Sequence, residues 1–233
     1  MLINTLEESF SILRSDTRYI AKALVGPLAL ALTAELMLLG VARWQPMSLT
    51  FYFAFEAVAE AIHIASYTLM VVVVSNAVLR DRTLGAGIGL FWGRRETRLF
   101  LYQLALYTIV MAALLLAIVP VAGFWIGMAV AGYFYSRFAL ILPGVAIDQP
   151  LTLHLAWQLS RSHKLGAFVL LWLLPGLAGL FIEGLLSGAA LLPFRVLVMF
   201  AVTLFFAIVL AVLYGRIVMA TSEEPDPGQP LSE

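Results

Sequence analysis

Long apolar runs are the feature of this chain that most limits what it can fold into. Six of them reach the roughly 20 residues that a helix needs to cross the hydrocarbon of a bilayer. They cover residues 19–41, 51–79, 98–120, 124–147, 166–186 and 194–220. The runs are uniformly apolar and lack the alternation that a membrane β-barrel requires. We therefore expect an all-α, polytopic membrane protein with six transmembrane helices.

The composition supports the same fold class. Hydrophobic residues make up 62% of the chain and charged residues only 12%, whereas soluble domains are about 25% charged. We expect residues 1–220 to form a single transmembrane domain, followed by a disordered cytoplasmic tail at 221–233, which is polar, acidic and rich in proline. A net charge of zero argues against a nucleic-acid partner. The absence of cysteine excludes disulfides and thiolate metal sites.

The basic residues are distributed unevenly between the two sides of the predicted bundle. Only Arg43 and Arg195 fall on one side, and Arg137 lies within the fourth run. The other eleven Lys and Arg residues fall on the opposite side. Because basic residues stay on the cytoplasmic side of a membrane, both termini are predicted to be cytoplasmic. The eleven are Arg14, Arg18, Lys22, Arg80, Arg82, Arg94, Arg95, Arg98, Arg161, Lys164 and Arg216.

Three segments on the cytoplasmic side are predicted to be interfacial amphipathic helices: 7–18, 81–98 and 148–164. In the last of them His154 and Gln158 are four residues apart and form a narrow polar edge on an apolar surface. Such a helix lies in the headgroup plane. The alternative is a loop that packs on the bundle.

The same three segments resemble one another in sequence. Residues 81–84 match 148–153, and residues 135–137 (Tyr-Ser-Arg) recur as 214–216 (Tyr-Gly-Arg). The simplest interpretation is a tandem repeat of three units, each an interfacial helix followed by a transmembrane hairpin. Two-span units keep one orientation, so this repeat differs from the inverted repeats that are common in alternating-access transporters.

A motif of polar and aromatic residues begins in the fourth run. It consists of Arg137, Pro143, Asp148, Ala156, Trp157, Ser160 and Arg161. Together with residues 10–14, the motif resembles the YciC-like group of bacterial inner-membrane proteins and the related membrane domain of some glycerophosphodiester phosphodiesterases. The resemblance implies a six-span protein of a bacterial inner membrane. It implies no particular reaction, substrate or cofactor.

Ionisable residues inside the spans are the sharpest candidates for a site, because a charge within the bilayer is costly. Glu56, Glu60 and His63 lie on one face of the second run, and Glu35 and Glu183 fall at a similar depth in the outer half. This cluster could bind a cation, carry protons or attract a headgroup. Glu60 and His63 form one Glu-x-x-His pair, and a di-metal site would need a second such pair. A purely structural role is the alternative.

The basic residues on the cytoplasmic side form a second candidate site, an inner rim suited to anionic lipid headgroups. Arg137 is expected to extend its long side chain to phosphates or to pair with Asp148. The alternative is that these basic residues only set the orientation of the protein in the membrane. The rim consists of Arg80, Arg82, Arg94, Arg95, Arg98, Arg137, Arg161 and Lys164.

The chain shows no catalytic, cofactor-binding or metal-binding motif. We therefore expect a non-enzymatic protein that acts in envelope or lipid homeostasis or as a partner in a membrane complex. Its expected partners are anionic lipids of the cytoplasmic leaflet. The alternative is a small transporter or channel that uses the outer acidic cluster. A deep polar cavity that reaches this cluster would favour transport.

Overall fold

The protein is described by a computed structural model. The model describes residues 2–15, 17–43, 48–80, 90–119, 122–149, 151–161, 163–186 and 191–219, and all regular structure in these ranges is helical. The predicted tail at 221–233 lies outside them, as does the first half of the predicted interfacial segment at 81–98. The elements are α1 (Leu2–Ser15), α2 (Thr17–Ala23), α3 (Val25–Arg43), α4 (Leu49–Leu79), α5 (Arg94–Leu114), η1 (Leu115–Ile118), α6 (Gly123–Phe138), α7 (Ile141–Ala146), α8 (Leu153–Leu159), α9 (Lys164–Phe168), η2 (Val169–Leu173), α10 (Leu174–Leu185), α11 (Leu192–Tyr214) and η4 (Gly215–Met219).

Five helical segments are long and apolar enough to cross a membrane. They are Leu49–Leu79, Arg94–Leu114, Gly123–Ala146, Lys164–Leu185 and Pro193–Val218. Each matches one of the predicted runs, from the second to the sixth, with ends that differ by six residues at most. The chain is therefore an all-helical, multi-pass membrane protein.

The first predicted run corresponds to α2 and α3, which are separated only by Leu24. Helical hydrogen bonds continue across this position, from Leu24 N to Ile20 O (3.0 Å) and from Leu28 N to Leu24 O (2.9 Å). Pro27, which has no backbone N–H, interrupts the ladder here. The apolar part of this helix, Val25–Gly40, is shorter than the five segments above. A sixth span therefore stays a prediction, as does the tandem repeat.

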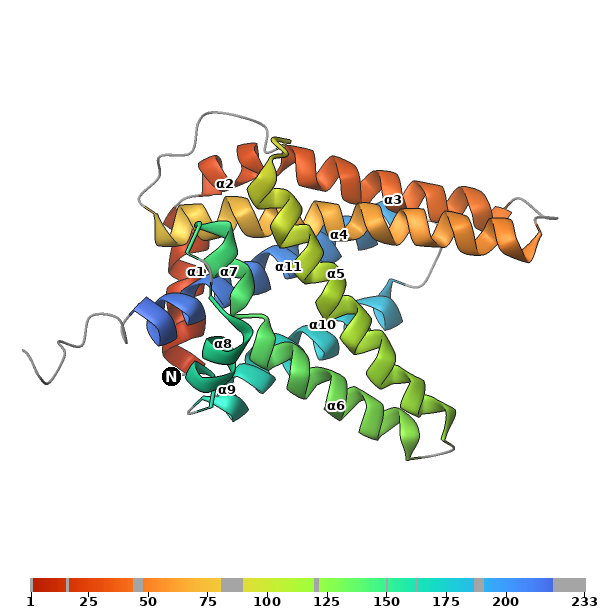
Figure 1. Ribbon diagram of the computed structural model, residues 1–233. Coiled ribbons are helices and arrows are strands. Elements are labelled where there is room, and N and C mark those ends of the chain that lie inside the picture. Colours follow the sequence, from red (N-terminus) through yellow and green to blue (C-terminus); the bar gives the residue numbers. More distant parts are fainter. Residues whose placement is uncertain are drawn as a thin grey trace, which may run out of the picture.

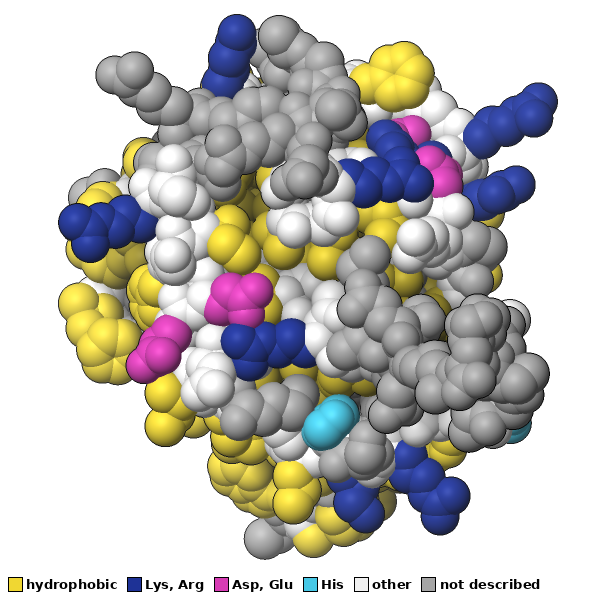
Figure 2. All heavy atoms as spheres, turned by 90° about the vertical axis from the view of Figure 1, so that its left-hand side faces the viewer, with side chains coloured by type: hydrophobic (Ala, Val, Ile, Leu, Met, Phe, Trp, Pro, Cys, Tyr) yellow, Lys and Arg dark blue, Asp and Glu magenta, His cyan; other side chains and the backbone are white. Residues whose placement is uncertain are grey.

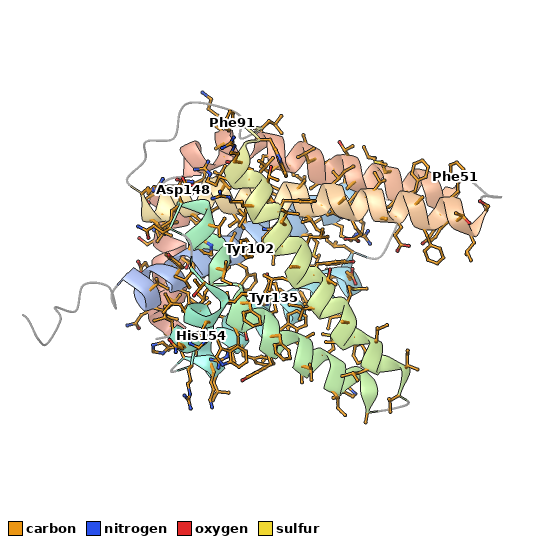
Figure 3. The ribbon with its side chains drawn as sticks, viewed as in Figure 1. Phe51, Phe91, Tyr102, Tyr135, Asp148 and His154 are labelled. Atoms are coloured by element: carbon orange, nitrogen blue, oxygen red, sulfur yellow. The ribbon has the colours of Figure 1, made fainter. Side chains whose placement is uncertain are left out.

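Successive helices pack as antiparallel hairpins: α3 with α4, α5 with α6, and α10 with α11. In Figure 1 the α3–α4 hairpin and the α5–α6 hairpin diverge toward their tips, away from the end that holds the N-terminus. Helix α11 packs against α1, α3, α4 and α10. Figure 3 shows Phe51 at one tip and Asp148 and His154 at the opposite end.

The most densely packed core lies near the end that carries α1 and α7. Its members include Val74 of α4, Ile141 and Leu142 of α7, and Ile208 and Leu213 of α11, all of which are at most 1% exposed. Most of α7 is buried within this core. The α3–α4 and α5–α6 tips carry mostly exposed side chains, which suits contact with lipid.

Small residues explain how closely α5 and α6 approach. Gly123, Gly127 and Ala131 are four residues apart on α6, and all three are buried. A Cβ on Gly123 would lie 2.0 Å from the carbonyl oxygen of Leu116, and one on Gly127 would lie 2.9 Å from that of Ala113. This small-xxx-small pattern lets two membrane helices touch through their backbones. It is visible in the sequence and could have predicted this hairpin.

Candidate functional site

Basic side chains gather at the end of the bundle that carries α1, which we call the basic end. Figure 2 looks onto this end and shows Lys and Arg around its edge, with apolar side chains between them. Five of the predicted rim residues are exposed there: Arg80, Arg94, Arg98, Arg161 and Lys164. Arg82 lies outside the described residues.

An exposed apolar segment accompanies two of these arginines. Leu90, Phe91 and Trp92 precede α5, and Phe91 is 77% exposed. Arg94 and Arg98 lie one helical turn apart immediately after this segment. Exposed aromatic residues beside arginine are typical of a protein surface at the headgroup level of a membrane.

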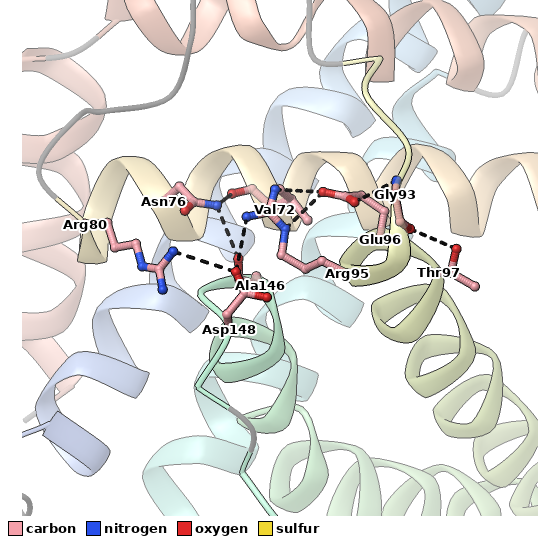
Figure 4. Close-up of polar contacts among 9 residues, drawn as sticks. All are labelled: Val72, Asn76, Arg80, Gly93, Arg95, Glu96, Thr97, Ala146 and Asp148. Atoms are coloured by element: carbon pink, nitrogen blue, oxygen red, sulfur yellow. Dashed lines mark hydrogen bonds and ion pairs between the residues drawn. The ribbon is translucent and has the colours of Figure 1, made fainter.

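Two other rim arginines pair with carboxylates of the protein. Arg95 donates to Glu96 Oε1 at 2.7 Å from Nη2 and 3.0 Å from Nε. Asp148 lies 3.8 Å from both Arg80 and Arg95, and Arg80 also donates to the carbonyl of Ile147. Figure 4 shows these contacts joining the end of α4, the start of α5 and the end of α7. Glu96, which is 2% exposed, also caps α5 by accepting from Gly93 N at 2.9 Å.

Asp148 occupies a backbone conformation that favours glycine. Its φ is +58°, in the left-handed region, where an L-residue with a side chain is disfavoured. Hydrogen bonds from Asp148 N to Val145 O (3.1 Å) and from Gln149 N to Gly144 O (2.8 Å) close a Schellman motif after α7. The motif holds the carboxylate next to the two arginines, a contact that glycine could not make.

Arg137 does not belong to the exposed rim, and the prediction that it reaches phosphates or Asp148 is wrong. The residue is 3% exposed. Its Nη1 donates to Ser160 Oγ at 3.1 Å, and its guanidinium lies 4.3 Å from the ring centroid of Trp157 and 5.6 Å from that of Tyr133. A desolvated cation over an aromatic face contributes about 2 kcal/mol. Arg137, Trp157 and Ser160, all part of the sequence motif, thus meet at one contact between α6 and α8.

The opposite half of the bundle contains the second candidate site. Glu35 of α3 lies between a histidine and an arginine: its Oε1 is 3.8 Å from His63 Nε2, and its Oε2 is 3.8 Å from Arg195 Nη2. These groups and Glu183 line a cavity of about 310 Å³ between α3, α4, α10 and α11. We call it the polar cavity. The structure therefore brings together three members of the predicted cluster, Glu35, His63 and Glu183, with Arg195.

Glu56 and Glu60 are not part of this arrangement. They do not line the polar cavity and lie near Tyr107 of α5 instead. Glu56 is seven residues from His63, about 10 Å along the helix axis, so one helix face meets different neighbours at different depths. The side chain of Arg43 lies outside the described part of the chain. Among the described residues, no three His, Asp or Glu side chains are placed to hold a metal ion.

Two further cavities adjoin the polar cavity. One of about 320 Å³ is mainly apolar and lies between α4, α5, α6 and η2, and we call it the apolar cavity. His63 and Tyr67 line both this cavity and the polar one. The third, of about 270 Å³, lies between α4, α6, α10 and α11. Tyr67 and Tyr135 interact with each other and line both the apolar and the third cavity.

Gln103 is a member of this site that the sequence did not indicate. It lines the apolar cavity and is 6% exposed. Its Oε1 lies 2.6 Å from Thr68 Oγ1, whose single hydrogen is also within reach of the Ile64 carbonyl at 2.8 Å, and its Nε2 has no hydrogen-bond partner among the described residues. A single glutamine in an apolar run carries no distinctive spacing, so only the packing of α4 against α5 reveals it.

Comparison with known proteins finds no match to any family model, curated protein or solved structure.

Proposed function

We propose that this chain is a non-enzymatic, six-span protein of a bacterial inner membrane, akin to the YciC-like group. In this proposal it acts in envelope or lipid homeostasis and holds anionic lipid at its basic end, which faces the cytoplasm. The observation that carries the proposal is the exposed pair Arg94 and Arg98 beside the exposed Phe91. Cations next to an apolar anchor attract anionic headgroups, at about 1 kcal/mol for each basic residue near the surface.

The six-span topology rests on the length of the first hairpin. Helices α2 and α3 continue one another, and α3 packs along α4, which has 31 residues. At 1.5 Å per residue α4 is about 46 Å long, more than the roughly 30 Å of the hydrocarbon layer. A helix that lies alongside such a span is immersed to a similar depth. With six spans, both termini lie on the same side as the basic end.

The experiment that tests the rim is removal of its two exposed arginines. Arg94→Gln with Arg98→Gln should lower the amount of phosphatidylglycerol or cardiolipin that stays bound to the purified protein, as counted by native mass spectrometry. Two lost charges predict a decrease of roughly tenfold or more. Arg95 is left unchanged because it already pairs with Glu96.

A matched variant shows whether lipid is lost because the charges are removed or because the protein does not fold. Arg94→Lys with Arg98→Lys keeps both charges and should retain the lipid. Unchanged lipid content in the double glutamine variant would refute the proposed role of the rim.

A second candidate function is supported by the polar cavity. A small transporter or channel would use Glu35, His63 and Glu183, which line a common space within the bundle. Replacing Glu35 by Gln should then abolish ion flux in proteoliposomes, whereas Glu7→Gln, on the exposed surface of α1, should not. Flux that is equal in both variants would exclude this candidate.

A further inference from the structure

We infer that the outer half of the bundle binds a zwitterionic phospholipid of the leaflet opposite the basic end. The phosphate and ammonium of its headgroup occupy the polar cavity, and one acyl chain follows the apolar cavity. This site is separate from the rim proposed above, so either proposal can fail without the other.

The charges in the polar cavity match such a headgroup. Arg195 supplies a guanidinium, the preferred partner of a phosphate. Glu35 and Glu183 supply carboxylates for an ammonium group, and all three side chains line the same space. An anion alone would meet two carboxylates, and a cation alone would meet Arg195. A headgroup that carries both signs satisfies the whole set.

These charges are not already paired tightly within the protein. Both contacts of Glu35, with His63 and with Arg195, measure 3.8 Å. That is well beyond the 2.7–2.9 Å of a charge-assisted hydrogen bond. Glu183 makes no ion pair or hydrogen bond among the described residues and is exposed. Headgroup atoms can therefore enter between them without first breaking a strong contact.

The free amide of Gln103 is a second, independent indication of a ligand. A buried polar group without a partner costs about 1–3 kcal/mol, and one end of the Gln103 amide is such a group at the wall of the apolar cavity. The junction of headgroup and chain supplies the missing partner, an ester carbonyl for the amide nitrogen or, with the amide turned by 180°, the ammonium for its oxygen. His63 and Tyr67, which line both cavities, mark this junction.

The remaining wall of the apolar cavity suits an acyl chain. Half of its lining residues are Ile64, Leu106, Val110, Leu142 and Trp172. The indole of Trp172 lies so close to α6 that a Cβ on Gly132 would be 2.2 Å from its Cδ1. Glycine at this position thus lets the tryptophan lie flat against α6 and leaves the space open.

The depth of the site is also that of a lipid headgroup. Arg195 and Arg216 are 21 residues apart along α11 and η4, about 32 Å at 1.5 Å per residue. Arg216 lies at the basic end, where it pairs with Glu8 of α1. Arg195 therefore lies close to the opposite interface of a hydrocarbon layer about 30 Å thick, and the apolar cavity lies beneath it.

Competition between two lipids tests the inference. The full chain in detergent is offered equal amounts of phosphatidylethanolamine and phosphatidylglycerol with acyl chains of different mass, and bound lipid is counted by native mass spectrometry. Glu183→Gln and Arg195→Gln should each reduce bound phosphatidylethanolamine about tenfold and leave phosphatidylglycerol unchanged. The control Glu7→Gln, an exposed carboxylate on α1, should change neither. Equal loss of both lipids, or binding like that of the wild type, would overturn the inference.

A measurement on the unaltered protein keeps the inference testable if a variant does not fold. Phosphatidylethanolamine with a photoreactive diazirine in its acyl chain should label Leu106, Val110 or Trp172, which line the apolar cavity. Labels confined to Leu101 and Leu104, on the exposed face of α5, would show that the lipid only surrounds the bundle and would overturn the proposed site.

Discussion

Charged side chains at the two ends of the bundle are held in different ways. At the basic end Arg95 and Glu96 are 2.7 Å apart and Arg216 and Glu8 are 2.5 Å apart, both direct hydrogen-bonded pairs, while Asp148 lies 3.8 Å from Arg80 and Arg95. In the outer half both contacts of Glu35 are 3.8 Å. The Arg216–Glu8 pair joins η4 to α1, whereas the longer contacts in the outer half leave Glu35 and Arg195 available to a ligand.

The packing of apolar residues is also tighter at the basic end than in the outer half. The core around α7 and the second half of α11 is almost completely buried, whereas the three cavities lie between α3, α4, α5, α6, α10 and α11 and border this core at residues such as Leu142 and Leu210. Dense packing resists deformation, and open packing leaves room for a bound molecule. We therefore expect substitutions at the basic end to lower stability and those in the outer half to change binding.

The largest effect on stability is expected for Arg137→Ala. This variant removes a buried side chain that stacks on Trp157 and bonds to Ser160. Loss of the packing and of the cation–π contact should cost about 3 kcal/mol, which lowers the melting temperature by roughly 8 °C for a chain of this length. Thermal unfolding of the purified protein in detergent measures this change in melting temperature.

Arg161→Ala is the matched control, because Arg161 is exposed on the same segment as Ser160. This substitution should lower the free energy of unfolding by about 0.5 kcal/mol at most. If both variants melted together with the wild type, Arg137 would be an ordinary surface residue, and the buried contact between α6 and α8 would be refuted.

A smaller effect is expected for an added methyl group at two glycines. A Cβ on Gly144, at the basic end, would lie 2.8 Å from the backbone oxygen of Gln149 and 3.1 Å from the hydroxyl of Tyr214. Gly144→Ala should therefore cost about 2 kcal/mol in stability. A Cβ on Gly176 of α10 would meet nothing within 4 Å, so Gly176→Ala should gain up to about 1 kcal/mol through helix propensity. Equal melting temperatures for both variants would contradict the packing difference between the two ends.

The sequence predicts the spans well because the signal is local. A helix that faces lipid must be apolar over its whole length, so hydropathy alone locates a span such as Leu49–Leu79, predicted as 51–79. The first run is the exception. Pro27 divides it between α2 and α3 and shortens its apolar helix.

The partners of polar residues were harder to predict because they depend on how helices rotate against one another. Glu60 and His63 share a helix face, yet His63 lies beside Glu35 while Glu60 lies near Tyr107. Arg137 is four residues before Ile141, at the boundary of a buried segment, and its partners Trp157 and Ser160 follow a turn that no sequence pattern specifies. Such contacts need the tertiary structure.

The smallest effect on stability, but a measurable one on lipid binding, is expected for Asp148→Asn. Asn tolerates the left-handed conformation as Asp does, so the variant removes only two partly exposed ion pairs, with Arg80 and Arg95, worth less than about 1 kcal/mol each. The freed arginines should raise bound phosphatidylglycerol several-fold. Asp148→Gly should bind the same lipid as strongly and melt at a higher temperature than Asp148→Asn, because glycine suits a φ of +58°. If neither variant bound more phosphatidylglycerol, Arg80 and Arg95 would serve only to join helices, and lipid attraction at the basic end would depend on the exposed residues such as Arg94 and Arg98 alone.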